Sequence, residues 1–297
     1  MKIKQMAPIF RCKTQDAYVL KVLCELLQNN LRKACFELSD SGIKLCMSDH
    51  YHQILIHLDL DSDNFSVYKF KEDTKYIGIN LVHLHKMLKT IKKKDSLELF
   101  IDDEYPEDLG IRVFPKENNS RVTTSKVKIQ SMQYIDTEFP TGYGKPVIVP
   151  SSEYQKMTKE LNTIGSTITI YSKGFFIKFK SDPSNTYSKD VKFGEENGVD
   201  SDNEDSDDEN QEYCQDFQTE MLNRIAKISG LSNNMQIFPK EGLPLLFKSS
   251  VGSLGKISIY MKSKHQSESE NHAVDSDHDS ENEEDIVEKS KNIRVKK

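Results

Sequence analysis

Residues 79–95 read INLVHLHKMLKTIKKKD, and their periodicity decides how the surrounding chain folds. At about 100° per residue, the apolar side chains of this stretch share one face of an α-helix. That face carries Leu81, Leu84, Leu88 and Ile91. The opposite face carries Lys86, Lys89 and Lys93. The stretch therefore predicts an amphipathic helix that packs on a core and presents lysine side chains to the outside.

These lysines stand out because the chain as a whole is acidic, with a formal net charge of −6. Two stretches hold much of the acid: residues 195–216 contain 11 acidic residues and residues 266–285 contain 9, with no Lys or Arg in either. Without them, 41 Lys and Arg outnumber the remaining 27 of the 47 acids. Such segments, rich in Ser, Asn and Asp, bury too little apolar surface to order themselves. We expect a disordered insert at 195–216, a disordered tail at 266–297 that ends in the basic run KSKNIRVKK, and a basic folded body.

Strand and helix periodicities alternate through that body. Helices are predicted at 17–31, around 81–93, at 151–164 and at 219–229. Strands are predicted at 36–47, 52–60, 96–101, 125–132, 146–150, 166–172, 175–180, 234–238, 244–250 and 255–261. The order of these elements repeats, because KMLKTIKKKDSLELF (86–100) and NRIAKISGLSNNMQIF (223–238) both read as helix, polar turn and strand. We predict two tandem α+β domains of antiparallel sheet with amphipathic helices, at 1–136 and 148–265, joined by a linker at 137–147.

The other predicted helices share the basic bias of the first. Their outward cations are Lys21, Arg32, Lys156, Lys159, Arg224 and Lys227. A lysine-rich surface of this kind suits the phosphate backbone of a nucleic acid, which it binds without regard to base sequence. The sequence carries no zinc finger, basic leucine zipper or aromatic RNA-recognition motif that would indicate base reading.

Two ordered strings, ACFELSDSGIKL (34–45) and IGINLVHLHKMLK (77–89), strongly resemble the first domain of proliferating cell nuclear antigen, the DNA sliding clamp family. Residues 149–170 resemble the start of its second domain, and residues 243–261 resemble its C-terminal strands. The resemblance covers 18–262 apart from the acidic insert. It implies a closed ring, usually of three identical two-domain subunits, whose helices line a channel around double-stranded DNA.

The resemblance also implies two sets of functional residues. The expected DNA-binding cations, including those from the helix periodicity, are Lys21, Lys86, Lys89, Lys93, Arg121, Lys156, Lys159, Arg224 and Lys227. Gln28 and Glu220 stand where family members carry a basic residue. An outer pocket beside the linker is expected to receive short aromatic-anchored peptides of partner enzymes. Its expected residues are Met47, Phe139, Pro140, Pro244 and Tyr260.

Enzymatic readings of the sequence are weak. The histidines at 50, 52, 57, 83 and 85 do not fall at the spacing of a metal site, and the five cysteines show no CxxC pair. No P-loop, GxSxG or Rossmann fingerprint is present. We therefore expect no catalysis, no cofactor and no metal. The absence of an apolar run near 20 residues and of a secretory signal leads us to expect a soluble intracellular protein without a membrane partner.

The expected partners are double-stranded DNA, a DNA polymerase, other clamp-binding proteins and a clamp loader. The expected location is the nucleus, or a viral replication site, since the acidic additions hint at a divergent lineage. Two other assemblies remain open: a subunit of a heterotrimeric clamp, and a monomeric processivity factor of the same fold. A homotrimer requires that residues 121–132 and 186–194 form exposed edges that pair head to tail.

Overall fold

The computed structural model describes residues 8–116, 121–135, 137–184, 186–195 and 212–269. In this part of the chain, one unit of strand, helix and three strands occurs four times. The first unit is β1 (Phe10–Thr14), α1 (Ala17–Asn30), β2 (Lys33–Ser39), β3 (Gly42–Ser48) and β4 (Ile54–Asp61). The second is β6 (Thr74–Asn80), α2 (Leu81–Leu88), β7 (Ser96–Asp102), β8 (Tyr105–Phe114) and β9 (Thr123–Gln130). The short strand β5 (Val67–Phe70) lies between these two units.

The second half of the chain follows the same plan. Its first unit is β10 (Val147–Pro150), α3 (Ser151–Asn162), β11 (Thr167–Lys173), β12 (Phe176–Ser184) and β13 (Tyr187–Phe193). Its second is β14 (Tyr213–Gln218), α4 (Thr219–Arg224), β15 (Asn234–Phe238), β16 (Leu245–Val251) and β17 (Gly255–Met261). Short 3₁₀ turns lie at Ser62–Asn64 and Ala226–Gly230. The predicted α+β class of two tandem antiparallel domains is confirmed.

Within each half, the two units exchange their first strands. Strand β1 pairs with β7 of the second unit, while β6 pairs with β2 of the first. Likewise β10 pairs with β15, and β14 pairs with β11. Neither unit can therefore complete its sheet alone, and each half is one interlocked domain.

The two halves are joined by a ladder between β17 and β4. Seven residue pairs align in antiparallel register, from Gly255 opposite Leu60 to Met261 opposite Ile54. The ladder makes one continuous sheet of 13 strands, in the order β10-β15-β16-β17-β4-β3-β2-β6-β9-β8-β7-β1-β5. The two backbones approach closely at the Gly255 end of this ladder. A Cβ on Gly255 would lie 2.1 Å from the Asp59 carbonyl oxygen, so this position requires glycine.

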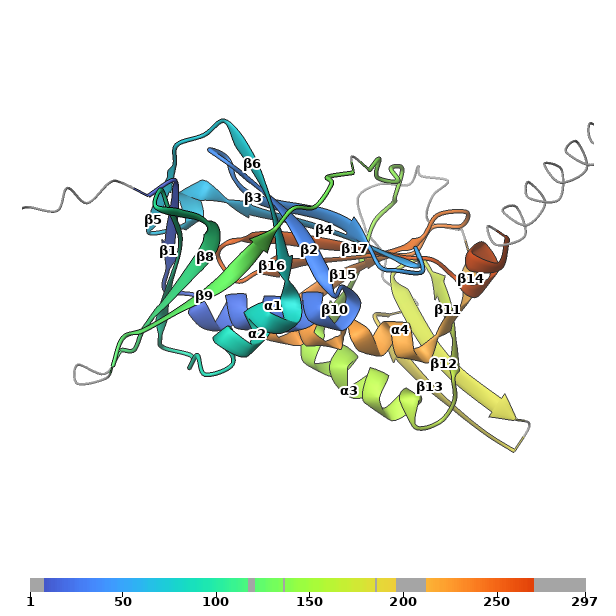
Figure 1. Cartoon of the computed structure of the whole chain (residues 1–297). Helices are drawn as coiled ribbons and strands as arrows, with labels where there is room; N and C mark the ends of the chain where they lie inside the picture. The colour runs from blue at the N-terminus through green and yellow to red at the C-terminus, as the bar shows by residue number, and fades with distance from the viewer. Residues whose placement is uncertain (1–7, 117–120, 136, 185, 196–211, 270–297) are drawn as a thin grey trace, which may run out of the picture.

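A single layer of helices covers the inner side of the strands (Figure 1). Helix α1 contacts both α2 and the 3₁₀ turn that follows α4, and that turn also contacts α3. The layer therefore spans both halves. Helix α2 is capped at its start by Asn80, whose side chain accepts a hydrogen bond from the His83 backbone N–H at 3.1 Å. Its apolar face is buried as predicted, with Leu81, Leu84 and Leu88 in the core.

Strands β9 and β13 each leave an edge open. The Thr123–Lys128 part of β9 pairs with β8 on one side, while β6 reaches β9 at residues 129 and 130. Strand β13 pairs with β12 and ends a separate sheet, ordered β13-β12-β11-β14. Since β9 belongs to the first half and β13 to the second, each of the two domains carries one of these open edges.

Several predicted boundaries are wrong. Helix α2 ends at Leu88, and a tight turn follows, in which the Asp95 carboxylate accepts from the Lys92 N–H at 2.8 Å; Lys93 lies in this turn and not on the helix. The predicted helix 219–229 breaks after Arg224, because the chain tightens at Ile225 into a 3₁₀ turn that buries Ile228.

The predicted insert and tail each include residues that form regular structure, and the predicted linker is one residue too long. Residues 213–216, assigned to the acidic insert, form the start of β14, where Tyr213 is buried. Residues 266–269, assigned to the tail, continue a helical turn that begins at Lys264. Val147, assigned to the linker, is the first residue of β10. The rest of the predicted insert and tail lies outside the described residues.

The ladder predicts that Ile56→Ala destabilises both domains together. Ile56 is fully buried on β4, opposite Ile259 of β17 and Met47 of β3. Loss of its buried side chain should lower the free energy of unfolding by about 2–5 kcal/mol. Urea denaturation followed by circular dichroism should show one transition that moves as a whole. Leu55→Ala, on the half-buried opposite face of the same strand, is the matched control and should cost less; two separate transitions, with one unmoved, would contradict the account.

Candidate functional site

The helix layer carries cations that fall into two groups. In the part of the chain that the structure describes, Lys86, Lys89 and Lys159 are exposed and make no side-chain hydrogen bond or ion pair. Arg121 is also exposed, but it precedes β9 and does not lie on a helix. The first three are therefore the side chains best able to bind an external anion.

Lys21 belongs to the second group, since its half-buried side chain is held by backbone carbonyls of the same chain. Its Nζ donates to the Lys89 carbonyl at 2.8 Å and to the Ile91 carbonyl at 3.1 Å. The Lys89 carbonyl is at the C-cap of α2 and the Ile91 carbonyl is in the turn that follows, so the lysine stabilises the end of this helix. Lys93 and Lys21 both lie over the ring of Tyr18, at 5.8 and 5.5 Å from its centroid. Lys21 thus ties α1 to the end of α2.

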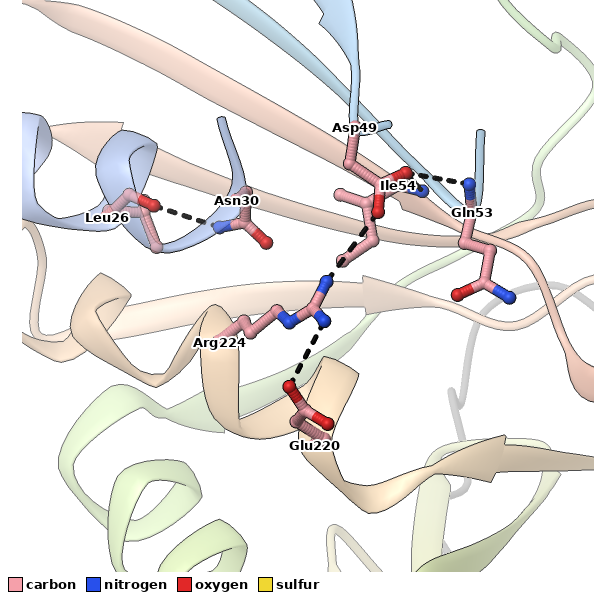
Figure 2. A network of polar contacts seen from close by, with 7 residues as sticks. All are labelled: Leu26, Asn30, Asp49, Gln53, Ile54, Glu220 and Arg224. Atoms are coloured by element: carbon pink, nitrogen blue, oxygen red, sulfur yellow. Dashed lines mark hydrogen bonds and ion pairs between the residues drawn. The ribbon is translucent and has the colours of Figure 1, made fainter. Parts of the chain in front are cut away.

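Arg224 joins the two domains, as Figure 2 shows. Its guanidinium lies 3.6 Å from the Asp49 carboxylate of the first domain and 3.1 Å from Glu220 on its own helix. Asp49 is 3% exposed, and its other carboxylate oxygen accepts from the backbone N–H groups of Gln53 and Ile54 at 2.8 and 3.0 Å. A carboxylate this deeply buried needs a cationic partner, so we assign Arg224 chiefly to holding the domains together.

Lys227 and Lys156 are also paired within the chain. Lys227 lies 2.7 Å from Glu25 of α1, which makes a second ionic contact between the two halves. Lys156 lies 2.8 Å from Glu153, one turn earlier on α3. Both side chains stay partly or fully exposed, and surface pairs of this kind are weak. An external polyanion can compete for these lysines, but it must displace a carboxylate to do so.

On the opposite, outer face of the sheet, aromatic side chains from the linker cover Tyr260 of β17. The Phe139 ring stacks on Tyr260 with centroids 6.0 Å apart, and Tyr143 lies 6.2 Å from the same ring. The Tyr143 hydroxyl donates to the Pro244 carbonyl at 2.8 Å, and burial raises the pKa of that hydroxyl, so it stays protonated. We call Phe139, Tyr143, Pro244 and Tyr260, together with His57, the aromatic cluster. Pro140 follows Phe139 and is half-buried.

The strand register excludes Met47 from this cluster. Met47 pairs with Ile56, and Ile56 pairs with Ile259, so these three side chains share the inner face. Tyr260 pairs with Leu55, and Leu55 pairs with Ser48, so this row lies on the outer face. Met47 packs against the core, and its sulfur accepts from the Cys35 backbone N–H. The prediction that Met47 lines the pocket is wrong by one residue, and Ser48 takes the outer position.

Sequence reasoning missed two members of the cluster. His57 was considered as a metal ligand, yet its ring lies 4.4 Å from the Phe139 ring. Burial lowers the pKa of His57, and the charges of Lys256 and Lys44 lower it further, although Asp59 opposes them. The imidazole is therefore neutral at pH 7 and offers Phe139 a flat surface. Tyr143 could have been found from its place in the linker, but nothing in FPTGYGKP shows which way its ring turns.

The described residues hold no group of three His, Cys, Asp or Glu side chains placed to bind a metal. Burial raises the pKa of the Cys12 and Cys24 thiols to about 12, so neither is a thiolate at neutral pH. None of the helices in the described part of the chain is long and apolar enough to cross a membrane.

Comparison with known proteins agrees with this geometry. The family model for the N-terminal domain of proliferating cell nuclear antigen matches residues 9–139, and the model for its C-terminal domain matches residues 140–264. The chain is 28% identical over 259 residues to the probable DNA polymerase sliding clamp 1 of Paramecium bursaria Chlorella virus 1, covering 84% of this chain and 95% of that protein. It is 26% identical over 258 residues to proliferating cell nuclear antigen of Chaetomium thermophilum, covering 86% of this chain and 98% of that protein.

A solved structure has the same fold. The crystal structure of proliferating cellular nuclear antigen from Entamoeba histolytica superposes with a TM-score of 0.74, covering 87% of this chain and all of that one, at 20% identity. Two interlocked domains, one helix layer and the open edges of β9 and β13 are the features of a clamp-type subunit. The chain belongs to the proliferating cell nuclear antigen family of DNA sliding clamps.

The aromatic cluster predicts how substitutions affect docking. Tyr260→Ala should abolish binding of aromatic-anchored clamp-interacting peptides, because it removes the ring on which Phe139 and Tyr143 rest. Met47→Ala is the matched control: it should leave peptide affinity within about twofold and, because Met47 is only partly buried against the core, lower the free energy of unfolding by less than the about 2–5 kcal/mol of a fully buried side chain. Calorimetric titration and thermal denaturation measure the two effects. Loss of peptide binding in Met47→Ala, or its retention in Tyr260→Ala, would show that the docking surface lies elsewhere.

Proposed function

We propose that this clamp closes into a homotrimeric ring around double-stranded DNA and tethers a DNA polymerase and other replication or repair enzymes. The observation that carries the proposal is the single helix layer. On its surface away from the sheet, Lys86, Lys89 and Lys159 have no ionic partner within the described chain. Cations on a smooth layer of helices can contact phosphates without entering a groove, so such contacts do not read sequence. A ring that holds DNA in this way can slide.

The open edges of β9 and β13 support ring closure. They lie on different domains, so an edge-to-edge contact between them is head to tail and repeats until the ring closes. Several lysines on and beside these edges are neutralised within the subunit, including Lys126 by Asp108 and Lys189 by Glu160. Like charges therefore do not forbid the pairing.

The aromatic cluster supports tethering. It presents Phe139 and Pro140 from the linker above Tyr260, on the face away from the helices, so a docked enzyme and a DNA duplex need not compete. We propose binding and not catalysis as the role of the chain, with a separate clamp loader to open the ring. The eukaryotic and viral origins of the two sequence relatives suggest work in the nucleus or at a viral replication site.

Assembly and topology test the proposal together. Light scattering at micromolar concentration should report about three times the 34.2 kDa chain mass. With a clamp loader and ATP supplied, the protein should stay on circular DNA at physiological salt and leave the same DNA after linearisation, because a ring slides off free ends.

Other outcomes identify the remaining assemblies. A strictly monomeric mass with equal retention on both DNA forms would replace the ring by a monomeric processivity factor. A ring that forms only when a second clamp subunit is added would mean a heterotrimer. Base composition of the duplex should not alter retention.

A further inference from the structure

The first domain carries a group of cations around one buried carboxylate. Glu98 of β7 is 1% exposed, and its two carboxylate oxygens accept from Arg11 Nε at 2.6 Å and from Arg112 Nη1 at 2.7 Å. Arg11 lies on β1 and Arg112 on β8, the two strands that flank β7 at one end of the molecule (Figure 1). One carboxylate therefore holds two arginines close together, and the three side chains keep a net positive charge.

Two lysines add to this charge. Lys13 lies opposite Glu98 in the ladder between β1 and β7, and the exposed Lys69 of β5 lies opposite Arg11. Arg11 and Lys13 point away from the core, because Cys12 between them is buried in it. We call the following four residues the cation cluster: Arg11, Lys13, Lys69 and Arg112.

Most donors of the cation cluster are free to bind an external group. Glu98 uses one nitrogen of each guanidinium, and neither arginine makes a further hydrogen bond within the described chain. The Arg112 Cζ lies 4.7 Å from the centroid of the Phe100 ring, and the Lys13 Nζ lies 4.6 Å from that of Phe114. These rings hold the cations in place without neutralising them. The two arginine side chains are 42% and 38% exposed, so their remaining donors can be reached from outside.

The fold itself does not require these charges. Strands β10, β15 and β16 of the second domain correspond to β1, β7 and β8 of the first, because the four units repeat. The row that corresponds to the one through Glu98 consists of Ile148, Gln236 and Lys248. This row holds no carboxylate and no arginine. Since buried ion groups are weak evidence for stability, the cluster of the first domain is better explained by a ligand.

A cleft lies beside the cation cluster, along the edge strand β5. Its volume is about 840 Å³, and Arg11 and Lys69 line it. Asp40 and Asp63 are exposed and line the same cleft, where Phe70 adds apolar surface. The cleft therefore presents cations and carboxylates side by side, in a volume that suits a small ligand or a short peptide segment.

This mixture of charges favours a peptide over a nucleic acid. A nucleic acid is negative along its whole length, so it would be repelled by Asp40 and Asp63 on one side of the cluster. On the other side, Lys126 and Lys128 are already paired with Asp108, at 3.5 and 2.8 Å, and offer a long polyanion little further attraction. A peptide can carry both signs. Two neighbouring guanidinium groups suit a phosphate monoester, which has a charge of about −1.5 to −2 at pH 7 and strong acceptor oxygens.

We propose that the cation cluster binds a phosphorylated serine or threonine of a partner protein, and that Asp40 and Asp63 bind a basic residue beside it. The phosphate oxygens accept from Arg11 and Arg112, whose planar groups suit bidentate contacts, and the two lysines supply further charge. The partner docks only when it is phosphorylated. The site lies on a strand face, apart from the helix layer and from the edge of β9, so it depends neither on DNA nor on ring closure.

A peptide library tests the site on the full chain. The probe is a library with a fixed phosphoserine and randomised residues on both sides, and the same library with serine is the reference. We expect the protein to retain only the phosphorylated library and to enrich Lys or Arg beside the phosphoserine. Equal retention of both libraries would overturn the proposal. So would displacement of the phosphopeptides by a single-stranded thymidine oligonucleotide, which would mean a general polyanion surface.

Two double substitutions locate the binding. Lys13→Ala/Lys69→Ala leaves both arginine contacts of Glu98 intact, so the protein should fold, and it should bind the enriched phosphopeptide about tenfold more weakly in fluorescence polarisation. The control is Lys178→Ala/Lys248→Ala, which removes equal charge from strands of the second domain. It should stay within about twofold of the unaltered chain. Equal losses in the two variants, or no loss in the first, would overturn the proposal.

Asp40→Asn/Asp63→Asn tests the role of the cleft. The library should then lose its preference for Lys or Arg beside the phosphoserine, because the carboxylates that receive the basic side chain are gone. Retention should still require the phosphate. An unchanged preference would show that the basic residue binds elsewhere, and would overturn the assignment of the cleft.

Discussion

The backbone ladder between β17 and β4 is the constraint on which the rest of the molecule depends. It fixes two domains in one sheet, and by doing so it sets four helices from both domains into one layer. The same ladder carries Tyr260 on its outer side and Ile259 on its inner side. One set of hydrogen bonds therefore positions both the cationic face and the aromatic cluster, on opposite sides of the strands.

Ionic contacts reinforce this joint and explain why the cations of the helix layer are not equivalent. Arg224 reaches Asp49 and Lys227 reaches Glu25, each across the two halves. Removing Arg224 would leave a buried carboxylate without its cation, which is strongly destabilising. Lys86 and Lys159 have no such partner among the described residues. A cation that stabilises the fold is less available to a ligand, so we expect the unpaired lysines to make most of the contacts with DNA.

Much of the fold could be predicted from the sequence, because apolar periodicity is a local signal. The Leu81, Leu84 and Leu88 stripe and the alternation in 255–261 indicated elements that the structure confirms. The strand exchange could not be predicted, since it depends on which distant strands pair. The error at Met47 has a similar origin: Met47 and Ser48 must face opposite sides of β3, and only the register of β3 against β4 shows which of them shares the buried face with Ile56. The division of the predicted cations into paired and unpaired members could not be predicted, because it depends on contacts such as that of Lys21 with the end of α2, which lie far apart in the sequence.

The central claim is that unpaired cations of the helix layer bind the phosphate backbone. Its most direct test compares Lys86→Ala/Lys159→Ala with Lys156→Ala/Lys227→Ala, two double substitutions that remove equal charge from the same layer. The measurement is duplex affinity against salt concentration. The account predicts that the first pair flattens the log–log slope by up to about 0.9 for each phosphate that a lysine no longer neutralises, while the second pair, already neutralised by Glu153 and Glu25, changes it less. Equal slopes in the two variants, or an unchanged slope in the first, would contradict it.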